Sequence, residues 1–137
     1  MKKRIIGIIF IVLGLLIALG PQFLFKVCEP THMDEMPMKC HWSARAEIGV
    51  GAVIAAFGIA LIIFTCAKIR LGFVIGILLS GIHALLIPYM LIGGCPGDRM
   101  PCQKIAFPAI TVISILLLIV AGIYTIYLAR KKSGGIV

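Results

Sequence analysis

The residues best suited to chemistry lie between positions 28 and 42, where thioether and imidazole side chains are concentrated. Three methionines, two histidines and two cysteines fall within these 15 residues. The candidate ligands among them are His32, Met36, Met38 and His41. Soft sulfur ligands together with imidazole suit Cu(I). The segment therefore predicts a candidate Cu(I) site, whereas the absence of CxxC and HExxH spacings in the sequence disfavours zinc.

Four of the five cysteines fall in two polar segments of the chain: Cys28, Cys40, Cys95 and Cys102. Outside the cytoplasmic membrane such thiols usually oxidise to structural disulfides. We expect the pairs Cys28–Cys40 and Cys95–Cys102, although four cysteines allow three pairings and cross-pairing stays open. Closing the 13-residue loop from 28 to 40 would contribute about 3 kcal/mol in the chain-entropy model. Cys66 is expected to be a reduced, packed thiol.

Three further ionisable residues are candidates for function. His83 falls inside an apolar run, where an ionisable group is a functional hypothesis by default. The alternative is a neutral imidazole bonded to the hydroxyl of Ser80, Thr111 or Ser114. Arg45 and Glu47 lie at the start of another apolar run, and we expect an interfacial ion pair between them rather than a catalytic pair.

These residues must be positioned by membrane helices. The chain has 137 residues, 61% of them hydrophobic and 13% charged, with a mean hydropathy of +1.15. This composition excludes an ordinary soluble domain and makes nucleic acid a poor partner. Four apolar runs, each long enough to cross a bilayer, predict four spans at about 5–25, 46–66, 72–92 and 105–129. The outer loops are then 26–45 and 93–104, and residues 1–137 form a single integral membrane domain.

The net charge of +8 indicates the orientation of these spans. Eight basic residues and no acidic residue fall on one side: Lys2, Lys3, Arg4, Lys68, Arg70, Arg130, Lys131 and Lys132. The other side carries five basic and all five acidic residues. By the positive-inside rule both termini are expected in the cytoplasm, with the protein in the cytoplasmic (cell) membrane.

The two halves of the chain carry a similar pattern. Gly14-x6-Pro21-x6-Cys28 is matched 67 residues later by Gly81-x6-Pro88-x6-Cys95. We interpret this match as an internal repeat of two tandem helical hairpins. Small residues also recur every four positions, and such ridges let membrane helices approach closely. They run through Gly72, Gly76, Ser80 and Ala84, and through Ala52, Ala56 and Ala60.

Two resemblances bear on the outer side. Met36, Met38, His41 and Trp42 are similar to the Met/His/Trp set of small periplasmic copper carriers. Four spans with cysteine-bearing outer loops resemble quinone-linked membrane oxidoreductases that generate disulfides, and Arg45 lies where such an enzyme contacts quinone. Those enzymes use a reactive CxxC pair, however, and the spacings here are Cx11C and Cx6C.

The run Met38-Lys39-Cys40-His41-Trp42, with Arg45, Glu47 and the Gly/Ala-rich second span, resembles a known family. It is similar to small prokaryotic four-span membrane proteins grouped as a domain of unknown function, and the similarity covers nearly the whole chain. The resemblance implies a four-span fold and no established activity. It also suggests an accessory role beside ABC-type transporters.

The prediction is therefore an all-α membrane protein, a four-transmembrane-helix bundle of two tandem hairpins with both termini inside. We expect a non-enzymatic accessory or scaffolding subunit without a cofactor. It would contact the lipid bilayer and either a membrane-protein partner or further copies of itself. The alternatives are Cu(I) binding or transport at the outer loop and quinone-linked thiol oxidation.

Overall fold

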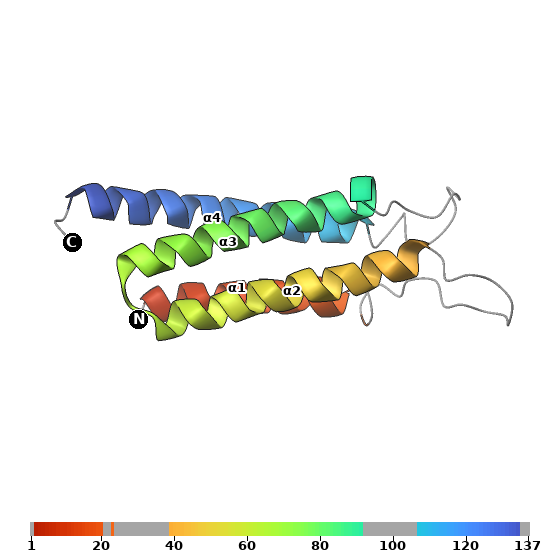
Figure 1. The fold of residues 1–137 in the computed structure, drawn as a ribbon, viewed down its shortest axis with the longest axis horizontal. Helices are drawn as coiled ribbons and strands as arrows, with labels where there is room; N and C mark the ends of the chain where they lie inside the picture. Colours follow the sequence, from red (N-terminus) through yellow and green to blue (C-terminus); the bar gives the residue numbers. More distant parts are fainter. Residues whose placement is uncertain (1, 21–22, 24–38, 92–106, 135–137) are drawn as a thin grey trace, which may run out of the picture.

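A computed structural model describes residues 2–20, 23, 39–91 and 107–134 of the chain. All regular structure in these ranges is helical, and the elements are α1 (Lys2–Leu19), α2 (Lys39–Ile63), α3 (Ala67–Leu86), the π-helical turn η2 (Ile87–Leu91) and α4 (Phe107–Gly134). The helices run along one long axis, and both termini lie at the same end (Figure 1). We call this end the basic end and the opposite one the loop end.

Within the described ranges, three helical segments are long and apolar enough to cross a membrane: Arg45–Ile63, Ala67–Leu86 and Phe107–Lys131. They match the second, third and fourth predicted spans, which indicates a membrane-embedded protein. The helix α1 is not among the three. Its 18 residues begin with Lys2, Lys3 and Arg4, which shorten its apolar part.

The turn between α2 and α3 lies earlier than the sequence predicts. It covers residues 64–66, so Lys68 and Arg70 belong to the first turn of α3 rather than to a loop before position 72. At the other end, α3 stops at Leu86 and gives way to η2, which contains Pro88. Proline has no backbone N–H to donate, so a change of helical hydrogen bonding here fits its position.

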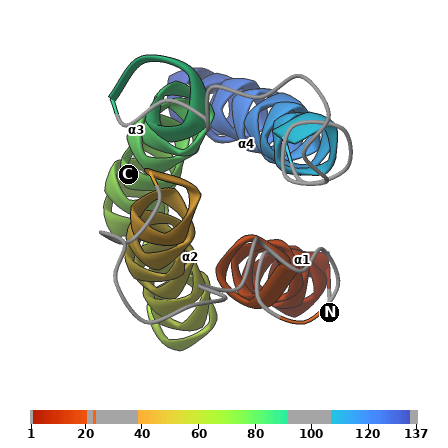
Figure 2. The same cartoon turned by 90° about the vertical axis from the view of Figure 1, so that its right-hand side faces the viewer.

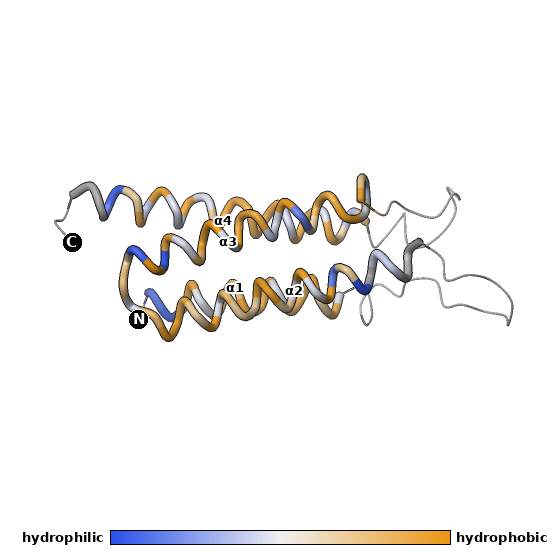
Figure 3. Tube along the Cα trace, viewed as in Figure 1, coloured by the Kyte–Doolittle hydropathy of each residue, from blue (hydrophilic) through white to orange (hydrophobic). Residues whose placement is uncertain are grey.

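The outer surface of the bundle is apolar along most of its length. Large hydrophobic side chains are exposed on every long helix, for example Leu15, Val53, Leu79 and Ile119. Figure 3 shows hydrophilic residues at the basic end and again near the loop end of α2, while the middle of each helix is mainly hydrophobic. A surface of this kind is unfavourable in water, which would contact a large apolar area, and it suits the hydrocarbon interior of a membrane.

The four long helices are not packed equally. The most extensive contacts join α1 to α2 and α3 to α4, while α2 also packs on α3. By contrast, α1 meets α4 over a short stretch. Viewed from the loop end, the helices follow one another in the order α1, α2, α3, α4 around an open side between α1 and α4 (Figure 2).

Glycines bring the backbones of α1 and α2 close together. A Cβ atom placed on Gly14 would lie 2.8 Å from the carbonyl oxygen of Gly51, and one placed on Gly51 would lie 2.5 Å from the carbonyl oxygen of Gly14. Gly7 and Gly58 make a second close approach nearer the basic end. Glycine is therefore required along this contact, since any side chain would push the helices apart.

The ridges predicted from the sequence lie elsewhere. Ala52 and Ala56 are exposed, so this alanine ridge does not make the contact with α1. On α3, Gly72 has nothing within 4 Å of a Cβ position, whereas Gly76 faces the ring of Phe57. The ridge on α3 thus runs from the open surface at Gly72, past the Phe57 ring at Gly76, to the buried face of the helix at Ala84.

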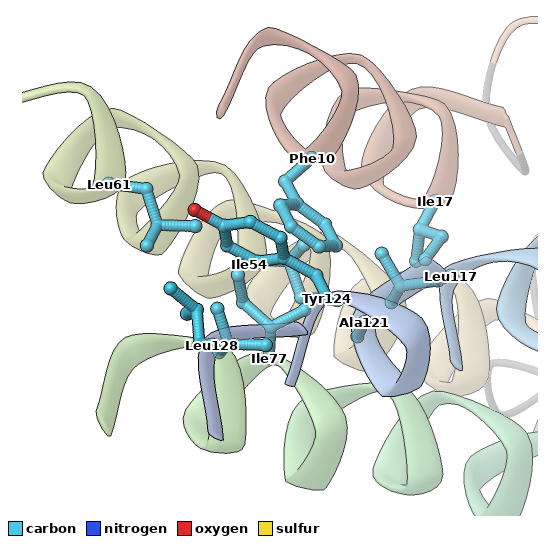
Figure 4. Packing of buried hydrophobic residues seen from close by; sticks show 10 residues of the cluster. Phe10, Ile17, Ile54, Leu61, Ile77, Leu117, Ala121, Tyr124 and Leu128 are labelled. Carbon is cyan, nitrogen blue, oxygen red and sulfur yellow. The ribbon is translucent and has the colours of Figure 1, made fainter. Parts of the chain in front are cut away.

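The core is formed by large apolar side chains from all four long helices. Phe10 and Ile17 of α1, Ile54 of α2, Ile77 of α3 and Leu117 of α4 are fully buried. They point toward one another across the bundle, and Tyr124 of α4 lies among them (Figure 4). This core fixes which faces of α3 and α4 point inward, and therefore which polar residues the bundle encloses.

Candidate functional site

Most of the predicted outer residues lie outside the described part of the chain. These are Cys28, His32, Met36, Met38, Cys95 and Cys102. Cys40 and His41 belong to the first turn of α2, but their side chains are not described either. Within the described residues, no group of three His, Cys, Asp or Glu side chains could hold a metal ion. The Cu(I) site and the disulfides stay predictions.

Arg45 and Glu47 do not form the expected ion pair. The side chain of Arg45 is exposed, while that of Glu47 has 0% of its surface accessible. Among the described residues neither carboxylate oxygen of Glu47 has a hydrogen-bond partner. The physical reason is helical geometry: residues two apart point in directions roughly 200° different, so one faces out and the other in.

Glu47 belongs to a polar layer inside the bundle near the loop end. Phe57 of α2 contacts α3 at Gly76, and Glu47 lies ten residues from Phe57 toward the loop end. Leu117 of α4 contacts α3 at Gly81, and Ser114 lies three residues from Leu117 toward the same end. At 1.5 Å per residue, and with five residues between the two contact points on α3, Glu47 and Ser114 lie within about one helical turn of each other along the bundle axis. Ser114 is fully buried, and its hydroxyl also has no partner in the described ranges. Ser43 is buried one turn beyond Glu47.

His83 is exposed rather than buried against a hydroxyl. Its Nδ1 lies 3.3 Å from the carbonyl oxygen of Leu79, one turn earlier on the same helix. The hydroxyls expected as its partners are directed elsewhere, because Ser80 donates to Gly76 O at 2.9 Å and Thr111 donates to Phe107 O at 2.8 Å. The predicted hydrogen bond of His83 to a hydroxyl is therefore wrong.

A groove lies between α2 and α3 on the same face as His83. It has a volume of about 520 Å³, and its polar lining residues are Ser80 and His83. Its lining also includes two glycines, Gly49 of α2 and Gly76 of α3. A Cβ atom on Gly49 would meet nothing within 4 Å. This α2/α3 groove is an apolar surface with one imidazole at its margin.

Arg70 is the centre of a buried network at the basic end. Only 2% of its surface is accessible. Its Nε donates to the hydroxyl of Tyr124 at 3.0 Å, and its Nη2 donates to the same hydroxyl. Its Nη1 donates to Leu61 O at 3.0 Å and its Nη2 to Lys3 O at 3.3 Å. The guanidinium group therefore joins all four long helices.

Sequence reasoning counted Arg70 among the basic residues of the cytoplasmic side and missed its network with Tyr124. A signal was available, because Arg70 falls on the inward face of α3 with Val74, Ile77 and Gly81, at the spacing of helical turns. Tyr124 falls in the same way on the buried face of α4. Nothing in the sequence indicates that these two residues, 54 positions apart, would meet.

A cavity of about 470 Å³ lies beside this network. The polar residues that line it are Lys2, Lys3, Thr65, Arg70, Tyr124, Tyr127 and Lys131. Its apolar lining includes Ile6, Val120, Ile123 and Leu128. We call this space the basic-end cavity. It combines positive charge at one end with a hydrocarbon surface.

Cys66 is a free thiol, as the sequence predicts, but it is not packed. It is exposed at the N-cap of α3, where it makes no side-chain capping hydrogen bond. Since the turn lies at 64–66, Cys66 falls in the turn rather than at the inner end of a buried helix.

The comparisons with known proteins agree with a family that has no assigned activity. Comparison with the curated proteins gave no match, and comparison with the solved structures gave none. A family model described as "Domain of unknown function (DUF4418)" matches residues 10–127, which covers α2, α3 and most of α1 and α4. The chain belongs to this family.

Proposed function

We propose that this chain is a non-enzymatic accessory or scaffolding subunit that binds a helix of a partner membrane protein in the α2/α3 groove. An ABC-type transporter is the partner class that the sequence resemblance suggests. The proposal includes four membrane spans, both termini in the cytoplasm of the cell, and an internal repeat of two hairpins. It also includes an outer cap braced by disulfides among Cys28, Cys40, Cys95 and Cys102.

The exposure of His83 carries the proposal. His83 lies within the apolar span of α3, and one ring nitrogen already faces its own helix. The other nitrogen has no partner in the described residues, and a polar group left in hydrocarbon costs free energy. A partner helix with a hydroxyl or amide group would satisfy that nitrogen and cover the groove.

The shape of the groove supports the same occupant. Gly49 leaves the backbone of α2 accessible, and membrane helices associate where small residues permit close packing. Leu79 is 59% exposed in the same groove, so an apolar side chain is ready to contact a second helix.

Site-specific photocrosslinking in native membranes tests this proposal. A photoreactive residue at Leu79 should give one discrete protein adduct. The matched control is Ile119, which is 53% exposed on α4 and does not line the groove. Crosslinking to lipid alone at both positions, or an adduct with a second copy of this chain, would contradict an accessory subunit.

A second variant separates loss of binding from loss of folding. Gly49→Leu should fill the groove without disturbing the bundle, because nothing lies within 4 Å of its Cβ position. Gly122→Leu on α4 is equally unobstructed and lies away from the groove. We expect the Leu79 adduct to disappear in the first variant and to persist in the second.

A further inference from the structure

Arg70 is a buried positive charge without a counter-ion in the described structure. Its acceptors are the Tyr124 hydroxyl and two backbone carbonyls, and all of them are neutral. Glu47 is the one acidic residue within the described ranges, and it lies near the loop end. Hydrogen bonds satisfy the donors of a guanidinium group, but burial of an uncompensated charge still carries a free-energy cost.

Further positive charge surrounds the basic-end cavity next to Arg70. Lys2, Lys3 and Lys131 line the same space, and no acidic residue among those that the structure describes lines it. Four like charges around one cavity repel one another when it is empty of anions. An anion in the cavity would be attracted by all four charges and would offset the free-energy cost of burying the charge of Arg70.

The remaining lining of the cavity defines the kind of anion. Ile6, Val120 and Ile123 form an apolar wall between α1 and α4, where these two helices have few mutual contacts. A small hydrated anion gains no free energy from contact with an apolar wall, whereas a hydrocarbon chain gains the free energy of leaving water. Both α1 and α4 line the cavity while sharing few contacts with each other, so an acyl chain along this wall does not have to separate a tightly packed helix pair.

We propose that the basic-end cavity binds one anionic phospholipid. Its phosphate lies among Lys2, Lys3 and Lys131 within the field of Arg70, and one acyl chain lies along Ile6 and Ile123 between α1 and α4. The lipid fills the gap between the first and the last helix and joins the two helical pairs.

Lipid retention by the purified full-length chain tests the proposal. The protein in detergent is exposed to equal amounts of phosphatidylglycerol and phosphatidylcholine, and bound lipid is counted by native mass spectrometry. We expect one phosphatidylglycerol per chain and no retained phosphatidylcholine. Equal retention of both lipids would overturn the proposal.

Two triple variants separate the cavity from general surface charge. Replacement of Lys2, Lys3 and Lys131 by glutamine removes the cations that line the cavity. The same replacement at Arg4, Lys68 and Arg130 removes three exposed cations of the same end that do not line it. We expect the first set to weaken phosphatidylglycerol binding roughly a hundredfold, at about fivefold for each of the three charges, and the second to change it by less than tenfold. Equal losses would mean attraction to the surface alone.

The acyl chain has its own test. Ile123→Trp narrows the cavity, while Ile126→Trp places the same ring on an exposed position of α4 outside it. We expect the first variant to lose bound lipid and the second to keep it. Inorganic phosphate and soluble glycerophosphate are added as a separate arm. If either one raises the melting temperature as much as phosphatidylglycerol does, the site binds free phosphate and the lipid proposal is wrong.

Discussion

The replacement Tyr124→Phe tests the network that joins the four long helices. The Tyr124 hydroxyl accepts hydrogen bonds from Nε and Nη2 of Arg70, and its loss would leave two buried donors of a charged group without this acceptor. The ring stays in place, so the apolar packing of Tyr124 in the core is retained (Figure 4). The change therefore isolates the polar contribution.

The size of the effect follows from the type of bond. A hydrogen bond to a charged group contributes about 1.5–3 kcal/mol, and two such bonds here share one oxygen. We expect Tyr124→Phe to lower the free energy of unfolding by about 3 kcal/mol. Tyr127→Phe is the matched control, because that side chain is exposed and stacks on Tyr124 at a centroid distance of 6.2 Å. Its loss of a hydroxyl should change stability by less than about 0.5 kcal/mol.

The assay is unfolding of the full chain in mixed micelles with increasing sodium dodecyl sulfate, followed by circular dichroism. A double-mutant cycle with Arg70→Met adds the decisive measurement, since Tyr124→Phe should cost almost nothing once the guanidinium group is absent. The reasoning is refuted if Tyr124→Phe and Tyr127→Phe are equally stable, or if the two replacements at 70 and 124 are additive.

Two further predictions concern the glycine contact and the turn. Gly14→Ala should destabilise the bundle by about 1–3 kcal/mol in the same unfolding assay, because its Cβ would lie 2.8 Å from the backbone of α2, whereas Gly122→Ala, with open space around it, should be neutral or slightly stabilising. Cys66 should react with a membrane-impermeant maleimide in permeabilised cells and not in intact ones, because it is exposed at the basic end, which we expect to face the cytoplasm. Equal labelling in intact cells would contradict that orientation, and equal stability of the two alanine variants would contradict the close contact.

The apolar runs were sufficient to predict the helices α2, α3 and α4, because a long stretch without charge has few other stable structures in lipid. The rule that charges lie at the interface failed at Arg70. That rule assumes that a charge in the bundle finds no partners, but Tyr124 and two carbonyl oxygens supply them. These partners come from three other helices, so a pattern within one helix could not reveal them.

The helix contacts show a similar limit. The sequence predicted contacts through small residues spaced four apart. The contact between α1 and α2 instead uses glycines spaced seven apart on each helix: Gly7 and Gly14 on α1, and Gly51 and Gly58 on α2. Both spacings place small residues on one face of a helix. Which face of a helix makes the contact depends on which face carries the large core residues. Phe10 of α1 and Ile54 of α2 fill the core beside the glycines, so the glycine faces of the two helices meet.

The two buried ionisable residues of opposite charge do not neutralise each other. Arg70 bonds to the carbonyl oxygen of Leu61, and Glu47 lies 14 residues from Leu61 along α2. This separation corresponds to about 21 Å of helix. At that distance, with an effective dielectric constant of about 20, their attraction is about 0.8 kcal/mol. Neither residue therefore serves as the counter-ion of the other, and a stabilising anion for Arg70 has to be supplied locally. The cavity that borders Arg70 is lined by Lys2, Lys3 and Lys131, and an anionic lipid supplies that charge from the surrounding bilayer.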